Sequence, residues 1–279
     1  MHRHPYFDLM LHDDDELSAL LGSRVVERTT LHEWPLSCVQ RVTTADGTRS
    51  IYKAQTAPTI EPEFYAAARS PLLPRARTIY RTDQHACMLI EFVDAPRLAD
   101  LRLPAAELKR IGRAIIEAMS QMEGQLPVVL DVGSPAAWAA VAESMLDTLH
   151  GLMDAGRFTA VDAKALRAIE RAADSESVLD AVSAPAGLIH SDLGGENVFV
   201  LGESYRVIDW QYPKRGPADL DLAILLESIG LDPRHYVDTG FVSLMVLLRI
   251  AWLIACATRW FTPGTQSYDR QIAQLATQL

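Results

Sequence analysis

Residues 188–200 read Leu188-Ile189-His190-Ser191-Asp192-Leu193-Gly194-Gly195-Glu196-Asn197-Val198-Phe199-Val200, and residues 207–210 read Val207-Ile208-Asp209-Trp210. Apolar runs alternate here with short polar turns, which is typical of strands joined by tight connections. The pattern predicts two strand-like flanks that hold Asp192, Asn197 and Asp209 at turn positions on one edge of a small sheet. Two carboxylates and a carboxamide suit a hard, oxygen-ligated cation such as Mg2+ and leave one carboxylate to accept a proton.

The spacing of these polar residues is informative beyond their types. His190-x-Asp192-Leu193-x-x-x-Asn197 matches the catalytic-loop pattern of protein kinases, and Asp209 falls where the metal-binding aspartate of D-F-G would lie. Aspartate and asparagine also favour turns, so each residue alone could be an ordinary turn residue. The joint pattern, with apolar flanks on both sides, favours the kinase interpretation.

The stretch resembles the catalytic loop of the aminoglycoside phosphotransferase family, small-molecule kinases that show H-G-D-L-x-x-x-N and then I-D-W. Ser191 replaces the usual glycine, which should cost little if the backbone there does not need a positive φ. The resemblance implies that Asp192 takes the proton of the acceptor hydroxyl and that Asn197 and Asp209 hold Mg2+. It also implies that ATP or GTP is the phosphate donor and that His190 is structural.

The family's fold is α+β and bilobal, like that of protein kinases. The resemblance therefore implies an N-terminal nucleotide-binding lobe (1–93) with an antiparallel five-stranded sheet and one helix, and a larger, mainly helical lobe (94–279). Apolar segments predict the five strands, and Asp46-Gly47 predicts a hairpin between the second and the third. The strands are expected at residues 25–26, 38–42, 51–53, 76–80 and 87–93.

The nucleotide site is expected to draw on the N-terminal lobe. Lys53 ends a strand, like the kinase lysine that holds the α- and β-phosphates, and its partner should be Glu61 or Glu63 on the next helix. We prefer Glu61 because of its family-like spacing to the aromatic pair that follows. First-turn acids also favour the helix dipole, which is the alternative for either residue. The backbone carbonyl of Glu91 and the backbone N–H of Val93 are the candidate adenine contacts in the hinge.

The loop expected to cover the nucleotide phosphates, residues 31–37, contains no glycine. This departs from the glycine-rich loop of protein kinases. Ser37 and the backbone amides around it are the candidate phosphate donors.

After Pro96 the pattern becomes helical. Pro104 opens a helix closed by Gly124, and further helices are expected at residues 135–156 and 159–173. Residues 216–223 resemble the family's G-x-P-x-x-D-L-A helix start, where Asp221 would brace the catalytic loop and Asp219 is a candidate N-cap. The apolar stretch 241–261 contains Arg249 at its centre, so it predicts a buried helix and not a membrane span.

Composition narrows the class of protein. The 279 residues are 49% apolar, enough for a sizeable core, and carry a net charge of -10. No basic block could neutralise nucleic-acid phosphates, whereas an acidic protein is compatible with a cationic small substrate. Three cysteines without metal spacing predict reduced core thiols, and no secretion signal is visible, so a cytoplasmic location is expected.

The N-terminal segment offers two further patterns. His2, His4 and His12 are interpreted as solvated surface histidines and not as metal ligands. The acids at residues 13–15 precede a leucine-rich run and Gly22, which predicts an N-cap, a short helix and a glycine stop.

Three functional hypotheses follow. The first is an antibiotic kinase that phosphorylates a hydroxyl of an aminoglycoside or a similar aminated compound. The second is a metabolic kinase of the same fold that acts on an amino alcohol or an amino sugar. The third is an inactive nucleotide-binding scaffold, which the joint presence of Lys53, Asp192, Asn197 and Asp209 disfavours. An acceptor panel would separate the first two.

Overall fold

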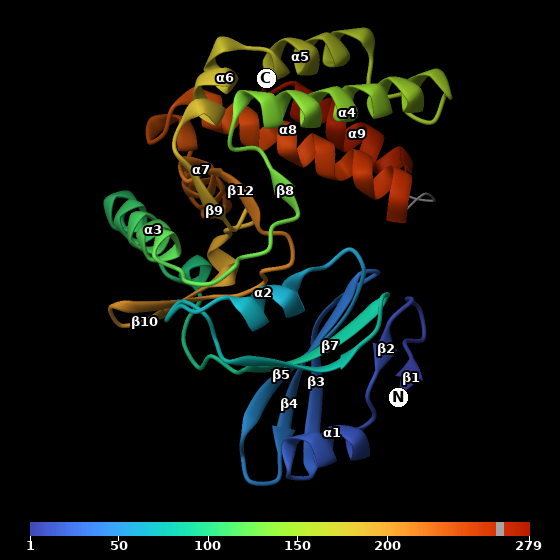
Figure 1. The fold of residues 1–279 in the computed structure, drawn as a ribbon, viewed down its shortest axis with the longest axis vertical. Helices are drawn as coiled ribbons and strands as arrows, with labels where there is room; N and C mark the ends of the chain where they lie inside the picture. Colours follow the sequence, from blue (N-terminus) through green and yellow to red (C-terminus); the bar gives the residue numbers. More distant parts are fainter. Residues whose placement is uncertain (261–264) are drawn as a thin grey trace. The chain divides into compact units, whose positions relative to one another are not determined.

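The computed structural model describes residues 1–260 and 265–279 (Figure 1). The protein forms two compact units that alternate along the sequence. The first comprises Met1–Arg102, Glu117–Val129 and Gly195–Pro213; the second comprises Leu103–Ile116, Leu130–Gly194 and Lys214–Leu279. This division differs from the predicted single boundary after Val93, because later segments pair with the first unit through backbone hydrogen bonds. Val200 N–H, for example, donates to Pro96 C=O over 3.0 Å.

The first unit contains the predicted five-stranded antiparallel sheet. Its spatial order is β3-β4-β5-β7-β6, so the fold-class prediction is confirmed. Gly47 adopts φ 82° in the turn between β4 and β5, as the Asp46-Gly47 signal predicts. The strands are β3 (Val25–Trp34), β4 (Ser37–Thr44), β5 (Arg49–Thr56), β6 (Ala76–Arg81) and β7 (His85–Glu91).

The predicted phosphate-covering loop at residues 31–37 is largely strand. Strands β3 and β4 continue to Trp34 and Ser37, which pair directly, so only Pro35 and Leu36 form the turn. A β-bulge between Thr30 and His32 interrupts the alternation of side chains there. The Ser37 side chain is buried, and its hydroxyl accepts a hydrogen bond from the Trp34 indole N–H over 2.7 Å.

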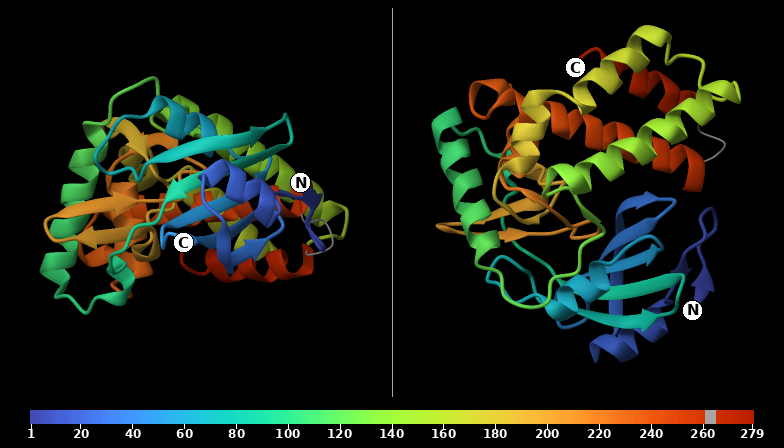
Figure 2. Two further views of the ribbon diagram at one scale, coloured as in Figure 1. Left: turned by 90° about the horizontal axis from the view of Figure 1, so that it is seen from below. Right: turned by 45° about the horizontal axis from the view of Figure 1, so that its top comes forward.

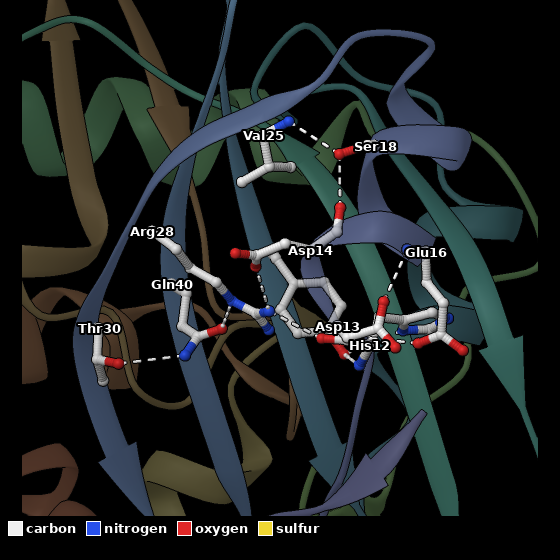
Figure 3. Close-up of polar contacts among 10 residues, drawn as sticks. His12, Asp13, Asp14, Glu16, Ser18, Val25, Arg28, Thr30 and Gln40 are labelled. Carbon is white, nitrogen blue, oxygen red and sulfur yellow. Dashed lines mark hydrogen bonds and ion pairs between the residues drawn. The ribbon is translucent and has the colours of Figure 1, made fainter.

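Helix α1 (Asp14–Leu21) begins and ends where its sequence signals place it. The Asp13 carboxylate caps the Glu16 N–H, the Glu16 carboxylate caps the Asp13 N–H, and Gly22 ends the helix at φ 72°. Arg28 on β3 fastens the start of this helix, because its guanidinium donates to His12 C=O over 2.8 Å (Figure 3).

Two of the three histidines predicted at the surface are buried. His2 is exposed in the short ladder of β1 (His2–Arg3) and β2 (Met10–Leu11). His4 stacks on Phe7 with ring centroids 5.1 Å apart, and the His12 N–H donates to the Tyr52 hydroxyl over 2.9 Å. Tyr52 is 40 positions from His12, and His4 is buried by a local turn in which its Nδ1 accepts the Tyr6 and Phe7 N–H groups. The prediction was therefore wrong for His4 and His12.

The segments around the catalytic-loop pattern do not form the single small sheet that the sequence predicted. Strand β9 (Ala186–Ile189) pairs with β12 (Lys214–Pro217), which also pairs with β8 (Leu130–Asp131). Strand β10 (Val198–Leu201) forms a separate hairpin with β11 (Ser204–Val207). The first flank therefore takes its partner from residues beyond Asp209, a pairing that short-range alternation cannot reveal.

The second unit is mainly helical and has a large apolar core. Helix α8 (Thr239–Ala255) contacts α4, α5, α6, α7 and α9 (Figure 2). Gly240 is needed at its start, because a Cβ there would lie 2.0 Å from the Ser177 carbonyl oxygen. The other helices of the second unit are α4 (Pro135–Asp154), α5 (Ala163–Ala173), α6 (Glu176–Ser183), α7 (Asp219–Ser228) and α9 (Thr265–Ala276), with short helical turns at Pro233–His235 and Cys256–Trp260. The first unit contains α2 (Glu61–Ala67) and short helical turns at Leu98–Asp100 and Gly195–Asn197. Helix α3 (Ala105–Ser120) contributes residues to both units.

Some predicted helix ends shift by a few residues. Helix α3 ends at Ser120 and not at Gly124, and α5 begins at Ala163, because Asp162 caps it by accepting the Ala165 N–H. Asp219 is not an N-cap: it lies within the first turn of α7 and pairs with Arg113.

The predicted apolar helix at residues 241–261 is found within the described residues, although Phe261 lies outside them. Thr239–Trp260 is long and apolar enough to cross a membrane by length and composition alone. Of its most apolar window, 61% is buried inside the protein, as expected of a core helix. The three cysteines are free and buried, as predicted.

Candidate active site

Lys53 stands at the centre of a buried charged cluster in the first unit. Its ammonium lies 2.7 Å from Glu61 Oε2 and 2.6 Å from Asp209 Oδ1. Burial by itself lowers the pKa of Lys53, but Asp209 and Glu61 outweigh that effect, and the net pKa is raised. The lysine therefore stays charged and joins two carboxylates that lie far apart in the sequence.

Glu61 and not Glu63 is the partner of Lys53. Glu61 is fully buried in the first turn of α2, whereas Glu63 pairs with Arg81 on β6. Successive side chains of a helix point about 100° apart, so two acids two positions apart cannot both face β5. The structure thus agrees with the preference drawn from the spacing.

Aromatic packing holds the cluster in place. Trp210, next to Asp209, stacks on Phe64 of α2 with ring centroids 4.4 Å apart and planes 9° from parallel. The Ile60 N–H also donates to Gln211 C=O over 3.4 Å, at the start of the same helix. The segment that carries Asp209 and the helix that carries Glu61 are therefore held together by two further contacts.

The β10–β11 hairpin brings Asn197 next to Asp209. Asn197 directly precedes β10, Asp209 follows β11 by two residues, and the Ile208 N–H donates to Asn197 C=O over 3.0 Å. Asp209 adopts φ 69°, an unusual conformation for a residue other than glycine, which often marks functional positions. A carboxamide and a carboxylate on one hairpin provide oxygen donors of the kind that Mg2+ prefers.

The two candidate hinge residues lie where the sequence places them. Glu91 is the last residue of β7, opposite Ser50 of β5, and Val93 lies two residues after the strand, outside any helix or strand. The Glu91 side chain is engaged with Arg75, because its carboxylate accepts the Arg75 N–H over 3.0 Å. The adenine role of Glu91 concerns only its backbone and stays a prediction.

In the second unit, Asp221 braces the loop that carries Asp192. Its two carboxylate oxygens accept the N–H groups of His190, over 2.7 Å, and Ser191, over 2.8 Å. Burial raises the pKa of Asp221, while its hydrogen bonds with the backbone N–H groups of His190 and Ser191 oppose the rise. His190 is buried, and its Nδ1 accepts the Asp192 N–H over 3.3 Å, consistent with a structural role.

Asp192 is exposed at the surface of this loop, which leaves its carboxylate accessible. Gly194 N–H donates to Asp192 C=O over 2.8 Å, so the residue's backbone is fixed on both sides. An accessible carboxylate on a rigid loop can receive a proton from a bound hydroxyl.

Ser191 does adopt the conformation that would have made a glycine preferable. The replacement of glycine by serine is expected to cost little only if the backbone does not need a positive φ. The φ of Ser191 is 67°, so the replacement carries a steric cost. Its hydroxyl receives a hydrogen bond from Lys214 Nζ over 2.6 Å. Sequence reasoning missed Lys214, because nothing in the local pattern distinguishes it from the exposed Arg215 that follows.

Tyr65 is the second residue that the sequence did not single out. It lies one turn after Glu61 on α2 and is 9% exposed, and its hydroxyl is among the buried polar atoms for which the described residues provide no hydrogen-bond partner. Burial first, and then the charges of Glu61 and Asp209, raise its pKa well above the usual value. The i, i+4 spacing from Glu61 is the sequence signal that could have placed it beside the cluster.

Another polar group in the first unit has the composition of a metal site. The ligand atoms of His4, Glu33 and Cys38 lie within 4.8 Å of one another. However, His4 Nδ1 accepts the N–H groups of Tyr6 and Phe7, so the neutral ring carries its proton on Nε2, which faces Glu33 Oε2 at 3.3 Å. Burial also raises the pKa of the Cys38 thiol. The group is better described as a hydrogen-bonded core histidine.

Comparison of the sequence with models of protein families gives one match, to a phosphotransferase enzyme family, over residues 51–243. The match therefore includes Lys53, Glu61, Asp192, Asn197 and Asp209. Comparison with curated protein sequences gives no significant match.

Solved structures share the fold at low sequence identity. A spectinomycin phosphotransferase, in complex with ADP and spectinomycin, is 13% identical with a TM-score of 0.54, over 97% of this chain and 100% of that one. A choline/ethanolamine kinase family protein from Mesorhizobium loti is 14% identical with a TM-score of 0.60, over 90% and 87%. The GDP complex of an aminoglycoside 2'-phosphotransferase mutant is 13% identical with a TM-score of 0.60, over 94% of both chains.

Proposed function

The chain belongs to the phosphotransferase enzyme family, and from this premise we propose that it transfers the γ-phosphate of ATP or GTP to a hydroxyl of a small, aminated compound. Aminoglycoside-like acceptors are the first class to test. The net charge of -10 supports a cationic substrate, and no basic block favours nucleic acid. A cytoplasmic location accords with the three free, buried cysteines.

The observation that carries this proposal is the contact of Lys53 with both Glu61 and Asp209, at 2.7 and 2.6 Å. Lys53 and Asp209 are 156 positions apart in the sequence, and a chance turn motif would not bring them into contact. Phosphoryl transfer depends mainly on positioning and on charge stabilisation, so a lysine held rigidly by carboxylates is suited to bind phosphate oxygens. This arrangement also argues against an inactive scaffold.

Each residue then has a defined role. Lys53, oriented by Glu61, binds the α- and β-phosphates, and the backbone of Glu91 and Val93 binds the adenine. Asn197 and Asp209 hold Mg2+, which neutralises phosphate charge when bound. Asp192 orients the acceptor hydroxyl and takes its proton as the oxygen attacks the γ-phosphorus and the bond to the β-phosphate oxygen breaks.

A metabolic kinase of the same fold is the second candidate. Its support is the fold shared with a choline/ethanolamine kinase family protein, at the same TM-score as that of the aminoglycoside enzyme. The residues of the cluster serve both candidates equally, because none of them defines the acceptor.

The test is nucleotide turnover with Mg2+ and either ATP or GTP, against a panel of aminoglycosides, amino alcohols and amino sugars. Transfer to one class of acceptor selects between the two kinase candidates. Nucleotide binding without transfer to any acceptor would contradict the substrate assignment. Absence of nucleotide binding would contradict the proposal as a whole.

The catalytic assignment is tested by Asp192→Ala. This change is expected to leave nucleotide binding intact and to reduce transfer by about 10²-fold or more, the range of general-base contributions. Asp180→Ala, which removes an exposed acid on α6, is the matched control. Full activity of Asp192→Ala would remove Asp192 from the mechanism.

A further inference from the structure

The loop that carries Asp192 contains a backbone conformation that its sequence does not favour. Ser191 has φ 67°, a region in which residues with a Cβ meet a steric penalty that glycine avoids. Serine at this position therefore has a steric cost, which a favourable contact of its side chain can offset.

Lys214 provides that contact. Its Nζ donates to Ser191 Oγ over 2.6 Å, and its strand β12 is paired with β9 so that Lys214 lies opposite Ile189, two residues before Ser191. The side chain is half-buried, and its ammonium interacts electrostatically with Asp192 and Asp221. The Lys214 side chain thus contacts the loop from β12, a strand that lies elsewhere in the sequence.

Asp221 holds the same loop as a hydrogen-bond acceptor. It accepts the N–H groups of His190 and Ser191, while Lys214 donates to the Ser191 side chain. The backbone and the side chain of Ser191 are therefore held by different charged residues. A glycine there would retain the first set of bonds and lose the second.

We propose that Lys214 and Ser191 form a coupled pair that positions Asp192 for proton transfer, with Lys214 as a positioning residue that also places a positive charge beside the Asp192 carboxylate. The inference rests on the proposed function, because Asp192 needs positioning only if it acts on a hydroxyl. Lys214 acts through Ser191 and through its charge, and it forms no bond to the transferred phosphate in this role.

Burial makes this ammonium more responsive than a surface lysine. Burial lowers the pKa of Lys214 to about 8, and the charges of Asp192 and Asp221 oppose part of that fall. Removing the cation therefore changes the electrostatic environment of Asp192, which removal of an exposed lysine would not do.

The first experiment compares Lys214→Met, Lys214→Arg and Ser191→Gly in steady-state kinetics. We expect kcat to fall about tenfold or more in Lys214→Met, with the KM for nucleotide unchanged, because the interaction acts on the transition state. Lys214→Arg should recover part of kcat. Ser191→Gly relieves the positive φ, so it should fold well and yet lose kcat. Arg215→Met, which removes the exposed neighbouring cation, is the matched control and should keep full activity.

The double variant Ser191→Gly/Lys214→Met tests the coupling itself. If the two residues act as one unit, the double variant should lose no more kcat than the less active single variant. Additive losses, or equal kcat in Lys214→Met and the wild type, would overturn the proposal.

A readout without any acceptor separates this inference from the proposed function. Amide hydrogen exchange across residues 188–194 should become about tenfold faster in Lys214→Met and stay unchanged in Arg215→Met. Faster exchange in a protein that transfers no phosphate would contradict the proposed function, while it would support the role of Lys214 in holding the loop. Unchanged exchange together with unchanged kcat would contradict the inference alone.

Discussion

The two units each contain a buried or half-buried lysine next to a candidate catalytic carboxylate, and the pKa values of the two lysines shift in opposite directions. Lys53 contacts two carboxylates directly, and its pKa is raised. Lys214 donates to the Ser191 hydroxyl, and burial lowers its pKa to about 8 although the charges of Asp192 and Asp221 oppose that fall. The same type of residue is therefore a permanent cation in one unit and a titratable one in the other.

The difference lies in how far the neighbouring carboxylates offset burial. For Lys53, the charges of Asp209 and Glu61 outweigh the desolvation of the ammonium, whereas for Lys214 the charges of Asp192 and Asp221 oppose only part of it. A permanent cation suits the binding of phosphate oxygens. A lysine that binds its proton less tightly suits a position where its charge supports a neighbouring base.

The largest expected effect comes from Lys53→Met. Glu61, which is fully buried, would lose its only ion pair among the described residues, and a broken buried pair costs about 3–5 kcal/mol. The free energy of unfolding should fall by this amount in urea denaturation. Adding Glu61→Gln should recover part of the loss; if it does not, the charge pair does not cause the destabilisation.

Asp209→Asn keeps the shape of the side chain and removes its charge. We expect phosphate transfer to fall by about 10²-fold or more and the dependence on Mg2+ concentration to weaken, because a few kcal/mol of charge stabilisation correspond to two or more factors of ten. Titration of the initial rate with Mg2+ measures both effects. An unchanged Mg2+ dependence would contradict the metal role of Asp209.

The pH dependence of the free energy of unfolding should distinguish Lys214 from Lys53. Lys214 binds its proton less tightly in the folded state than in the unfolded state, so unfolding takes up protons between about pH 8 and the usual lysine pKa. The wild type should therefore gain stability relative to Lys214→Met as the pH rises through this window, with the penalty fully present below pH 8. We expect on the order of 1–2 kcal/mol, since partial exposure screens the effect.

Thermal unfolding at pH 7 and pH 9.5 measures this difference. Lys53→Met serves as the comparison, because the raised pKa of Lys53 keeps that lysine protonated at both pH values. A constant difference between the wild type and Lys214→Met would show that Lys214 does not titrate in this range.

The smallest expected effect is that of Tyr65→Phe. The hydroxyl removed is buried without a hydrogen-bond partner among the described residues, so the free energy of unfolding should rise by about 1 kcal/mol. Tyr52→Phe is the matched control, because the Tyr52 hydroxyl accepts the His12 N–H and donates to Cys87 Sγ. That variant should lose about 1 kcal/mol. Destabilisation of both variants alike would mean that Tyr65 has a partner.

The elements with strong local signals were predictable from the sequence. Asp13 and Gly22 mark the ends of α1, and Asp46-Gly47 marks the hairpin between β4 and β5. The loop expected at residues 31–37 is shorter in the structure, because β3 continues to Trp34 and β4 begins at Ser37. The burial of His12 could not be predicted from the local sequence, because its partner Tyr52 is 40 positions away.

The spacing of residues 190–209 by itself determined the class of chemistry, because the order and separation of Asp192, Asn197 and Asp209 match those of kinase catalytic loops. Only the tertiary structure decided which residues complete each cluster. Glu61 is selected over Glu63 by the direction it faces on α2, and Lys214 reaches Ser191 through the pairing of β12 with β9. The physical reason is that a short motif specifies residue types and local turns, whereas charge partners are set by strand pairing and helix orientation over long sequence distances.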